Sequence, residues 1–238
     1  MIPPREHFLG RLLRLPLALL PPNSAMPILA GPLRGKKWVV GSSVHGCWFG
    51  SYESRKQQLI AGVLKPGQVM YDVGANVGLY SLLASAAVGP DGRVFAFEPV
   101  EENVRYLERH LKLNGISNCC AVRAAVSSKD GAEPFDFWND RSMGRLSALG
   151  TERVPTIRLD SFLAADPVKR RPDFVKIDVE GGEARVLEGA VSLLKENSPI
   201  VSVATHSPEL DLHCNKLLTS LGYTVRQIAA HDLWASRS

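Results

Sequence analysis

Short apolar runs and segments with helical spacing alternate along most of this chain. The runs at 69–73, 93–97, 119–126, 173–180 and 199–204 have the length and apolar content of buried strands. Most segments between them place apolar residues on one helical face and are bounded by glycine or proline. The pattern predicts an α/β domain in which helices cover both faces of a doubly wound, mostly parallel sheet.

Residues 127–159 interrupt this alternation. The segments 134–138 and 154–159 read as extended pieces on either side of a polar loop at 139–147. We expect a β insertion here, in place of part of a crossover connection, flanking the binding site of a substrate.

The first 54 residues differ from the rest. Residues 9–20 are apolar and basic, but they are too few for an integral membrane span, which needs about 20 apolar residues. We expect a helix that packs on the domain or on a second subunit, with peripheral membrane contact through 9–20 as the alternative. The loop at 41–53 is rich in glycine and aromatic residues and suits a lid over a ligand. We therefore divide the chain into an N-terminal extension with a cofactor and substrate lid, 1–54, and a main domain, 55–238.

Composition and charge narrow the class of protein. A hydrophobic fraction of 45% over 238 residues is ordinary for a globular domain with a full core. The net charge of +4 is spread along the chain, and its longest basic run is Lys169-Arg170-Arg171, so nucleic-acid binding is not indicated. The four cysteines form no C-x-x-C pair and no zinc spacing, so we expect reduced thiols, no metal site and a cytoplasmic location.

A glycine turn follows the first apolar run. Asp72 lies near the end of this run, and Gly74 and Gly78 follow it in the pattern D-x-G-x-x-x-G before a helix. Backbone N–H groups at such a turn bind ligands, and glycines let a ligand approach the main chain. A dinucleotide fingerprint needs a middle glycine, but Asn76 occupies that place, which argues against an NAD(P) oxidoreductase. Glu98 follows the second run about 20 residues later, where a carboxylate holds a ribose diol.

Charged residues also gather at the ends of the later runs. Asp178 and Glu180 end the fourth run, and His206 follows the fifth. Ligands of open α/β sheets bind at these strand ends, so the three side chains are expected in one site. Lys176 is unusual inside an apolar run and needs a partner, for which we consider Asp178, Glu180 or a substrate anion. Glu183 is interpreted as an acid that stabilises a helix N-terminus.

Four motifs together resemble the FkbM family of methyltransferases, which use S-adenosylmethionine (SAM). They are D-V-G-A-N-x-G from Asp72, F-E-P from Phe97, K-I-D-V-E-G from Lys176 and V-L-E-G-A from Val186. The resemblance covers about residues 50–225. It implies a seven-stranded, Rossmann-like class I methyltransferase sheet with SAM as cofactor. With the lid and strand-end arguments, it assigns these residues to the cofactor site: Tyr52, Glu53, Asp72, Gly74, Ala75, Asn76, Gly78, Glu98, Pro99, Ala125, Val126 and Asp178.

The resemblance also implies methyl transfer to a hydroxyl oxygen of a sugar, a lipid-linked glycan or a polyketide-type molecule. His206, Asp178 and Glu180 are expected beside the transferred methyl, with His206 as the first choice of general base and Asp178 as the second. Many family members carry an acid two residues before this histidine, whereas this chain has Ala204 there. A route in which Asp178 and Glu180 bind a metal is a minor alternative.

Two other classes stay open beside this one. Methyl transfer to a base or amide nitrogen is disfavoured because the fourth strand ends in D-V-E-G from Asp178 and not in N-P-P-Y, but other amines remain candidate acceptors. A non-catalytic binding module with the same fold is disfavoured because Asp72, Gly74, Gly78 and Glu98 are all present.

Overall fold

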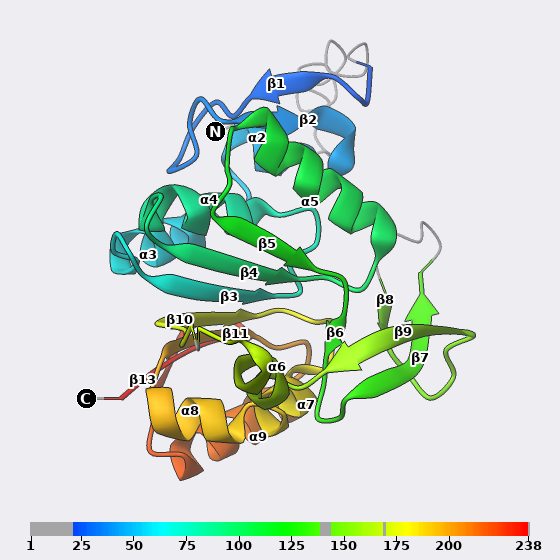
Figure 1. Cartoon of the computed structure of the whole chain (residues 1–238), viewed down its shortest axis with the longest axis vertical. Helices are drawn as coiled ribbons and strands as arrows, with labels where there is room; N and C mark the ends of the chain where they lie inside the picture. Colours follow the sequence, from blue (N-terminus) through cyan, green and yellow to red (C-terminus); the bar gives the residue numbers. More distant parts are fainter. Residues whose placement is uncertain (1–20, 139–143, 169, 238) are drawn as a thin grey trace.

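A seven-stranded sheet forms the centre of the molecule, in the order β12-β13-β11-β10-β3-β4-β5 (Figure 1). The computed structural model describes residues 21–138, 144–168 and 170–237, so the expectations for 9–20 and for part of the loop at 139–147 concern residues outside it. The strands of this sheet are β3 (Val69–Val73), β4 (Arg93–Phe97), β5 (Cys119–Val122), β10 (Phe174–Ile177), β11 (Ile200–Ala204), β12 (Thr224–Ala229) and β13 (Asp232–Ser236).

The sheet is mostly parallel, with one antiparallel strand. β3, β4, β5, β10 and β11 pair in parallel, while β13 runs antiparallel to both β11 and β12. The chain enters this sheet in the middle with β3, moves outward through β4 to β5, and returns on the other side of β3 as β10. The order therefore reverses between β3 and β10, which is where open α/β sheets bind their ligands.

Helices cover both faces of this sheet, as the alternation predicted (Figure 1). On one face Met70 and Val94 pack with α3 and α4, and Ala96 packs with α5. On the other face Tyr71 and Val175 pack with α7, α8 and α9. The helices are α3 (Ser54–Val63), α4 (Leu79–Val88), α5 (Glu101–Leu113), α6 (Leu159–Ala165), α7 (Glu183–Glu188), α8 (Val191–Asn197) and α9 (Pro208–Ser220).

A second, four-stranded sheet follows β5 and lies beside the carboxyl ends of the main strands. Its order is β6-β9-β7-β8. The single strand expected over 119–126 is wrong, because β5 ends at Val122 and the next two strand residues belong to β6. The Ala124 N–H donates to the Val122 carbonyl at 2.9 Å, a tight turn that sends the chain into the second sheet. The strands are β6 (Ala125–Val126), β7 (Gly131–Phe137), β8 (Gly144–Leu146) and β9 (Glu152–Ile157).

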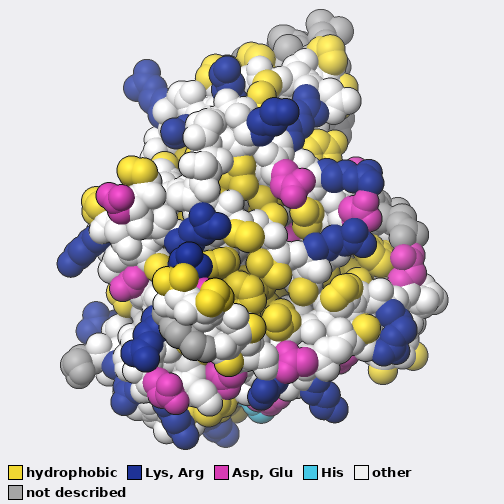
Figure 2. Space-filling view, viewed as in Figure 1, with side chains coloured by type: hydrophobic (Ala, Val, Ile, Leu, Met, Phe, Trp, Pro, Cys, Tyr) yellow, Lys and Arg dark blue, Asp and Glu magenta, His cyan; other side chains and the backbone are white. Residues whose placement is uncertain are grey.

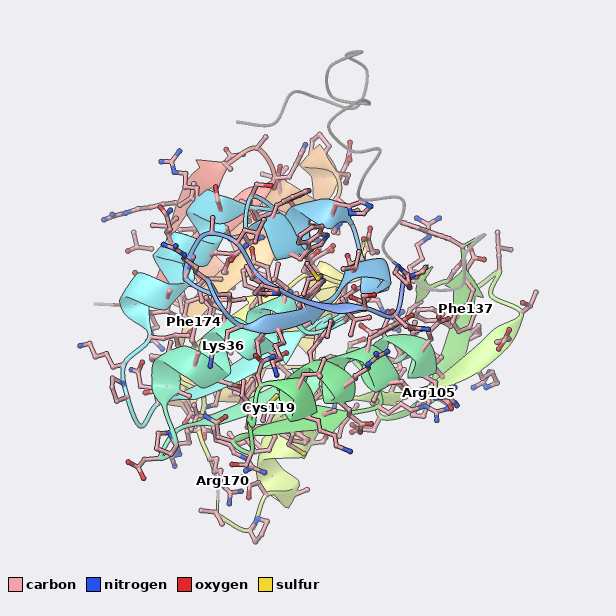
Figure 3. The ribbon with its side chains drawn as sticks, turned by 90° about the horizontal axis from the view of Figure 1, so that it is seen from above. Lys36, Arg105, Cys119, Phe137, Arg170 and Phe174 are labelled. Carbon is pink, nitrogen blue, oxygen red and sulfur yellow. The ribbon has the colours of Figure 1, made fainter. Side chains whose placement is uncertain are left out.

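The described part of the N-terminal extension shares a hydrophobic core with the main domain. β1 and β2 pair antiparallel and lie across α5, as Figure 3 shows from above. Trp38 from β2 is fully buried in the cluster that also holds Met70 and Val94. The segment at 41–53, expected as a loop, contains most of a 3-10 helix and all of a short α-helix. These elements are β1 (Ala25–Pro27), β2 (Lys37–Val39), η2 (Val40–Ser42) and α2 (His45–Phe49).

A buried histidine joins the extension to the glycine turn. The Val39 N–H donates to His110 Nε2 at 3.0 Å, and His110 Nδ1 lies 2.8 Å from the Val77 carbonyl. Burial lowers the pKa of His110 to about 4, so the ring is neutral near pH 7 and makes both bonds, donating from Nδ1 and accepting at Nε2. The Trp38 ring stacks on it with centroids 3.9 Å apart. The first described strands are therefore part of the framework that holds the turn at residues 74–78.

The surface shows no concentration of charge on the side seen in Figure 2. Hydrophobic side chains gather near its centre, and lysine and arginine side chains are scattered around them. No helix among the described residues is long and apolar enough to cross a membrane. All four cysteines are free thiols.

Candidate active site

A cavity of about 490 Å³ lies at the carboxyl ends of the central strands. Its walls come from the glycine turn, from the ends of β4, β10 and β11, and from the extension and the second sheet. Of the predicted site residues, those on its wall are Tyr52, Glu53, Gly74, Ala75, Asn76, Glu98, Pro99, Ala125, Val126, Asp178, Glu180 and His206.

The two glycines of the turn are required by packing within the protein. A Cβ on Gly74, whose φ is +73°, would stand 1.7 Å from the Asp178 carbonyl oxygen. A Cβ on Gly78, whose φ is +93°, would stand 2.9 Å from Cγ of Leu107 on α5. Gly74 lines the cavity and Gly78 does not. Both glycines therefore make room for neighbouring protein segments. The expectation that Gly78 opens the main chain to a ligand is corrected, because Gly78 does not line the cavity, whereas for Gly74 it stays a prediction.

Glu98 holds the turn together through its carboxylate. Oε2 accepts from the Asn76 N–H at 2.9 Å, and Oε1 accepts from the Val100 N–H at 3.0 Å and from Asn103 Nδ2 at 3.2 Å. Burial raises the pKa of Glu98 above its ordinary value, and these donors oppose the shift. Three of about four acceptor positions of the carboxylate are occupied, which leaves about one for a ligand.

Pro99 and the segment at 124–126, which includes β6, continue the wall beyond Glu98. Ala124, Ala125 and Val126 line the cavity with small apolar side chains, and Phe135 from the second sheet lines it too and belongs to the same hydrophobic cluster as Ala125. An apolar wall of this kind suits an aromatic ring.

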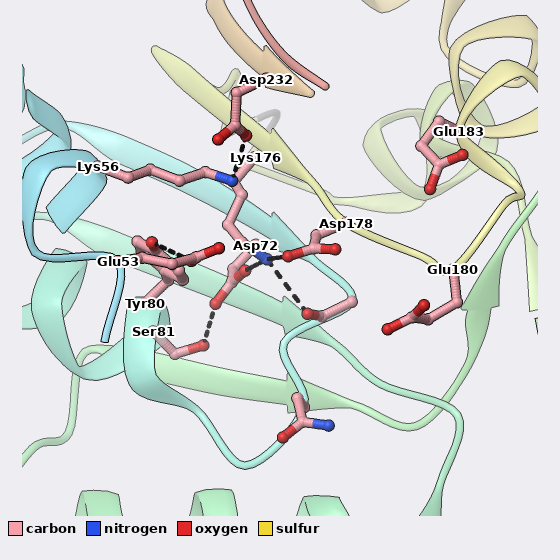
Figure 4. Close-up of polar contacts among 12 residues, drawn as sticks. Glu53, Lys56, Asp72, Tyr80, Ser81, Lys176, Asp178, Glu180, Glu183 and Asp232 are labelled. Atoms are coloured by element: carbon pink, nitrogen blue, oxygen red, sulfur yellow. Dashed lines mark hydrogen bonds and ion pairs between the residues drawn. The ribbon is translucent and has the colours of Figure 1, made fainter. Parts of the chain in front are cut away.

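Asp72 lies behind the cavity wall and pairs with Lys176. The two residues are direct neighbours in the parallel register of β3 and β10, and both are almost fully buried. Lys176 Nζ lies 3.2 Å from Asp72 Oδ1, 3.8 Å from Asp178 Oδ2 and 3.2 Å from the Gly74 carbonyl, which it donates to (Figure 4). The Ser81 hydroxyl donates to the other Asp72 oxygen at 2.6 Å. Asp72 is therefore placed to hold Lys176, which itself reaches the cavity.

Lys176 stays charged in this buried position. Burial works against the charge, but the carboxylates of Asp72 and Asp178 raise the pKa of Lys176 above its ordinary value. The predicted partner Asp178 is confirmed, whereas Glu180 contacts His206 instead, and the nearest partner, Asp72, was not among those considered. The ammonium also lies 5.2 Å from the centre of the Tyr80 ring.

His206 lies among three carboxylates. Nδ1 is 2.7 Å from Oε1 of the fully buried Glu183, and Nε2 is 3.2 Å from Glu180 Oε2 and 3.8 Å from Asp178 Oδ1. The hydrogen bond with Glu183 raises the pKa of His206 above its ordinary value of 6.5. Glu183, predicted only as a helix acid, supplies the carboxylate that Ala204 lacks.

Tyr52 and Glu53 lie at the edge of the cavity, next to the α3 N-terminus. The Tyr80 hydroxyl of α4 donates to Glu53 Oε2 at 2.6 Å, and Lys56 Nζ of α3 lies 2.7 Å from Asp232 Oδ1 of β13 (Figure 4). These two bonds tie the junction of the extension and α3 to α4 and to β13.

Backbone strain is concentrated at this cavity. Five non-glycine residues in the described ranges have φ in the left-handed region, and four of them line the cavity. Such conformations cost about 1–3 kcal/mol each and cluster at functional sites. The four are Glu53 (φ 43°), Asn76 (φ 49°), Glu180 (φ 56°) and His231 (φ 59°).

Sequence reasoning missed several members of this site. Tyr80 and His231 line the cavity, and Glu183 contacts His206 from behind. For Glu183 a signal was present, because a histidine without the usual acid needs a carboxylate from elsewhere. Nothing local marks His231, which lies between two strands at the end of the chain and reaches the site through the pairing of β13 with β11.

Two solved structures that resemble this chain are named methyltransferases. The chain resembles a precorrin-6y C5,15-methyltransferase from Geobacter metallireducens, with a TM-score of 0.52, 18% identity, and coverage of 78% of this chain and 88% of the other. It also resembles a methyltransferase FkbM from Methylobacillus flagellatus, with a TM-score of 0.50, 17% identity, and coverage of 80% and 53%. At these identities the likeness establishes the fold.

Relatives by sequence are methyltransferases as well. A hexuronic acid methyltransferase, AglP, from Haloferax volcanii is 31% identical over 139 residues, which is 57% of this chain and 55% of that protein. A methyltransferase from Beauveria bassiana is 24% identical over 141 residues, which is 50% and 56%. The chain thus spans about half the length of the curated relatives it matches.

The cavity suits SAM in size and in chemistry. Its volume of about 490 Å³ lies in the range of ligand sites, about 300–1,000 Å³. Glu98 offers a buried carboxylate to a hydroxyl group, and the alanines at 124–125 offer an apolar wall to a ring. Asp178 and Glu180 offer negative charge to a sulfonium. The family model of the methyltransferase FkbM domain matches residues 72–225, and with this site the chain belongs to the FkbM family of SAM-dependent methyltransferases.

Proposed function

We propose that this protein transfers the methyl group of SAM to a hydroxyl oxygen of a sugar-type acceptor, a free sugar, a lipid-linked glycan or a similar polyhydroxylated molecule. The observation that carries the proposal is His206 on the cavity wall, held by the buried Glu183 and facing Asp178 and Glu180. The relative named a hexuronic acid methyltransferase supports a sugar-type acceptor.

The cofactor is proposed to lie along the wall formed by the ends of β3 and β4. Glu98 accepts a hydrogen bond from a ribose hydroxyl, and the wall at 124–126 packs against the adenine. The turn at 74–76 faces the central part of the cofactor. Tyr52 and Glu53 close this wall from the extension. Asp72 acts through Lys176, since its carboxylate does not reach the cavity surface.

His206 is proposed as the general base. The bound cofactor supplies an activated methyl group on a positively charged sulfur, which leaves as the neutral thioether. As the acceptor oxygen receives this methyl group, His206 would take the hydroxyl proton at Nε2. With Nδ1 donating to Glu183, the neutral ring presents the lone pair of Nε2 to the cavity. Asp178, near the same nitrogen, is the second candidate.

Glu180 competes with the acceptor for His206. The contact of 3.2 Å between Nε2 and Glu180 Oε2 needs one proton between the two groups. Burial raises the pKa of Glu180, and His206 opposes that shift. An acceptor hydroxyl that reaches Nε2 therefore has to displace the Glu180 carboxylate, which lines the same cavity.

The test separates cofactor binding from transfer. Calorimetry with SAM and with NAD tests the cofactor wall, and a screen with radiolabelled methyl-SAM over neutral sugars, uronic acids, lipid-linked glycans, polyketides and simple amines tests the acceptor. Transfer to a hydroxyl, lost in His206→Ala with SAM binding retained, supports the proposal. Transfer only to amines would contradict the oxygen acceptor, and SAM binding without transfer to any class would favour a binding module.

A further inference from the structure

A second histidine shares the cavity wall with His206. His231 lies in the turn between β12 and β13, lines the cavity and has a left-handed backbone. Its side chain is 45% exposed, so a ligand can reach it. The base proposed above does not involve His231.

Hydrogen bonds fix this histidine beside the end of β11. Its carbonyl accepts from the Thr205 N–H at 2.8 Å, which anchors it next to the residue that precedes His206. Its Nδ1 lies 2.7 Å from Asp211 Oδ2 on α9, and the other oxygen of Asp211 accepts from the Thr205 hydroxyl. Backbone and ring are therefore both held, although the residue belongs to a surface turn.

The arrangement leaves one ring nitrogen for a ligand. When Nδ1 donates its hydrogen to Asp211, the neutral ring carries a lone pair at Nε2, and no described residue pairs with that atom. A neutral imidazole nitrogen can accept a hydrogen bond from a hydroxyl group of a ligand. His206 differs, because both of its nitrogens already face carboxylates.

We propose that His231 is an acceptor-binding residue that accepts a hydrogen bond from a second hydroxyl of the acceptor, beside the hydroxyl that is methylated. Asp211 is then a positioning residue that fixes the ring. The inference rests on the proposed function and narrows it, because it requires an acceptor with at least two neighbouring hydroxyl groups.

The charge of this wall selects the probe for the test. Asp178, Glu180 and Asp232 line the acceptor side, and Lys176 is shared between two carboxylates. A neutral polyol meets no repulsion there, so the probes are the methyl glycosides of glucose, galactose and mannose.

The experiment measures glycoside binding without requiring transfer. The full chain is loaded with S-adenosylhomocysteine, and each glycoside is titrated by saturation-transfer NMR. For the glycoside that binds best, His231→Ala is expected to weaken binding at least tenfold, His231→Gln to restore part of it through its amide oxygen, and Asp211→Asn to weaken it less than His231→Ala. The matched control is His213→Ala, an exposed histidine on α9 that does not line the cavity.

Two readouts distinguish binding from folding and from the proposed function. All variants should bind S-adenosylhomocysteine as the wild type does. If His231 only held the fold together, its replacement would weaken this binding too. Glycoside binding that is equal in His231→Ala and wild type overturns the inference, and so does failure of every glycoside to bind the wild type. Glycoside binding that depends on His231 but leads to no methyl transfer supports His231 as a hydroxyl-binding residue and overturns the proposed function.

Discussion

The two walls of the cavity are built in different ways. The centre of the proposed cofactor wall comes from two short stretches, the turn after β3 and the end of β4, and its main bonds run between a carboxylate and backbone N–H groups, as at Glu98 and Asn76. The acceptor wall joins β10, β11, α7 and the β12–β13 turn, and its bonds run between side chains, as at His206 and Glu183.

This difference determines how each wall responds to a substitution. Backbone donors keep their positions when a side chain changes, so the cofactor wall depends on turn conformation. The acceptor wall depends on charged side chains that hold one another, so single substitutions there change charge, proton affinity and specificity. Each prediction below tests one wall against the other.

The largest effect is expected at His206. His206→Ala should lower turnover by about 100-fold to 10,000-fold, the usual contribution of a general base, and leave SAM affinity nearly unchanged. Steady-state transfer rates and calorimetric SAM titration measure both quantities. Full turnover in this variant would move the role of base to Asp178 or exclude a base altogether.

Lys176 should have the largest effect on stability. Lys176→Met leaves the buried Asp72 without its counter-charge, which should cost about 3–5 kcal/mol in the free energy of unfolding. Urea denaturation measures the loss, with Lys195→Met on the exposed face of α8 as the control. The double variant Lys176→Met with Asp72→Asn should recover part of the loss, and an unchanged stability in Lys176→Met would show that the pair is not held as described.

Glu98 should show the opposite division between binding and turnover. Glu98→Ala removes the acceptor of the Asn76 N–H and of the ligand hydroxyl, so SAM binding should weaken by about 1–3 kcal/mol. Calorimetric titration with SAM measures the change in affinity in Glu98→Ala. The control is Glu102→Ala, an exposed acid in the first turn of α5. An unchanged affinity in correctly folded Glu98→Ala would remove Glu98 from the cofactor wall.

The rate of transfer and the stability of the fold should depend on pH in opposite ways through His206. Because Glu183 raises the pKa of His206, transfer should fall on the acid side at a pH above 6.5, the ordinary value for histidine. The charged ring stabilises the fold fully below its unfolded pKa, and this stabilisation is lost as the pH rises through the folded pKa. Activity should therefore rise where stability falls. Rate profiles of wild type and Glu183→Gln check this, and the acid limb of the variant should lie at lower pH.

The smallest effect is expected at the edge of the cavity. Tyr80→Phe removes the hydroxyl that donates to Glu53 and should weaken SAM binding by about 0.5–1.5 kcal/mol. Calorimetric titration measures it, with Tyr106→Phe on α5 as the control. Equal affinity in both variants would show that this bond does not hold the Tyr52–Glu53 segment over the cofactor wall.

Much of the cofactor wall was determined by the sequence alone. The alternation of apolar runs and helical stripes predicted the sheet, and the motif from Asp72 with Glu98 located the turn and its carboxylate, because these features depend on neighbours along the chain. The close packing of Leu107 against Gly78 was not predictable, since Leu107 lies on a helix that begins more than twenty residues later.

The strand-end pattern predicted that Asp178, Glu180 and His206 share one site, but only the tertiary structure decided which partners hold them. The register of β10 beside β3 places Lys176 opposite Asp72, although 104 residues separate them, whereas Glu180, close in sequence, turns to His206. The pairing of β13 with β11 brings His231 next to Thr205. Strand order and register depend on packing over the whole sheet, so no local pattern in the chain predicts these contacts. The charged side chains that would act on the acceptor come together only once the sheet has formed.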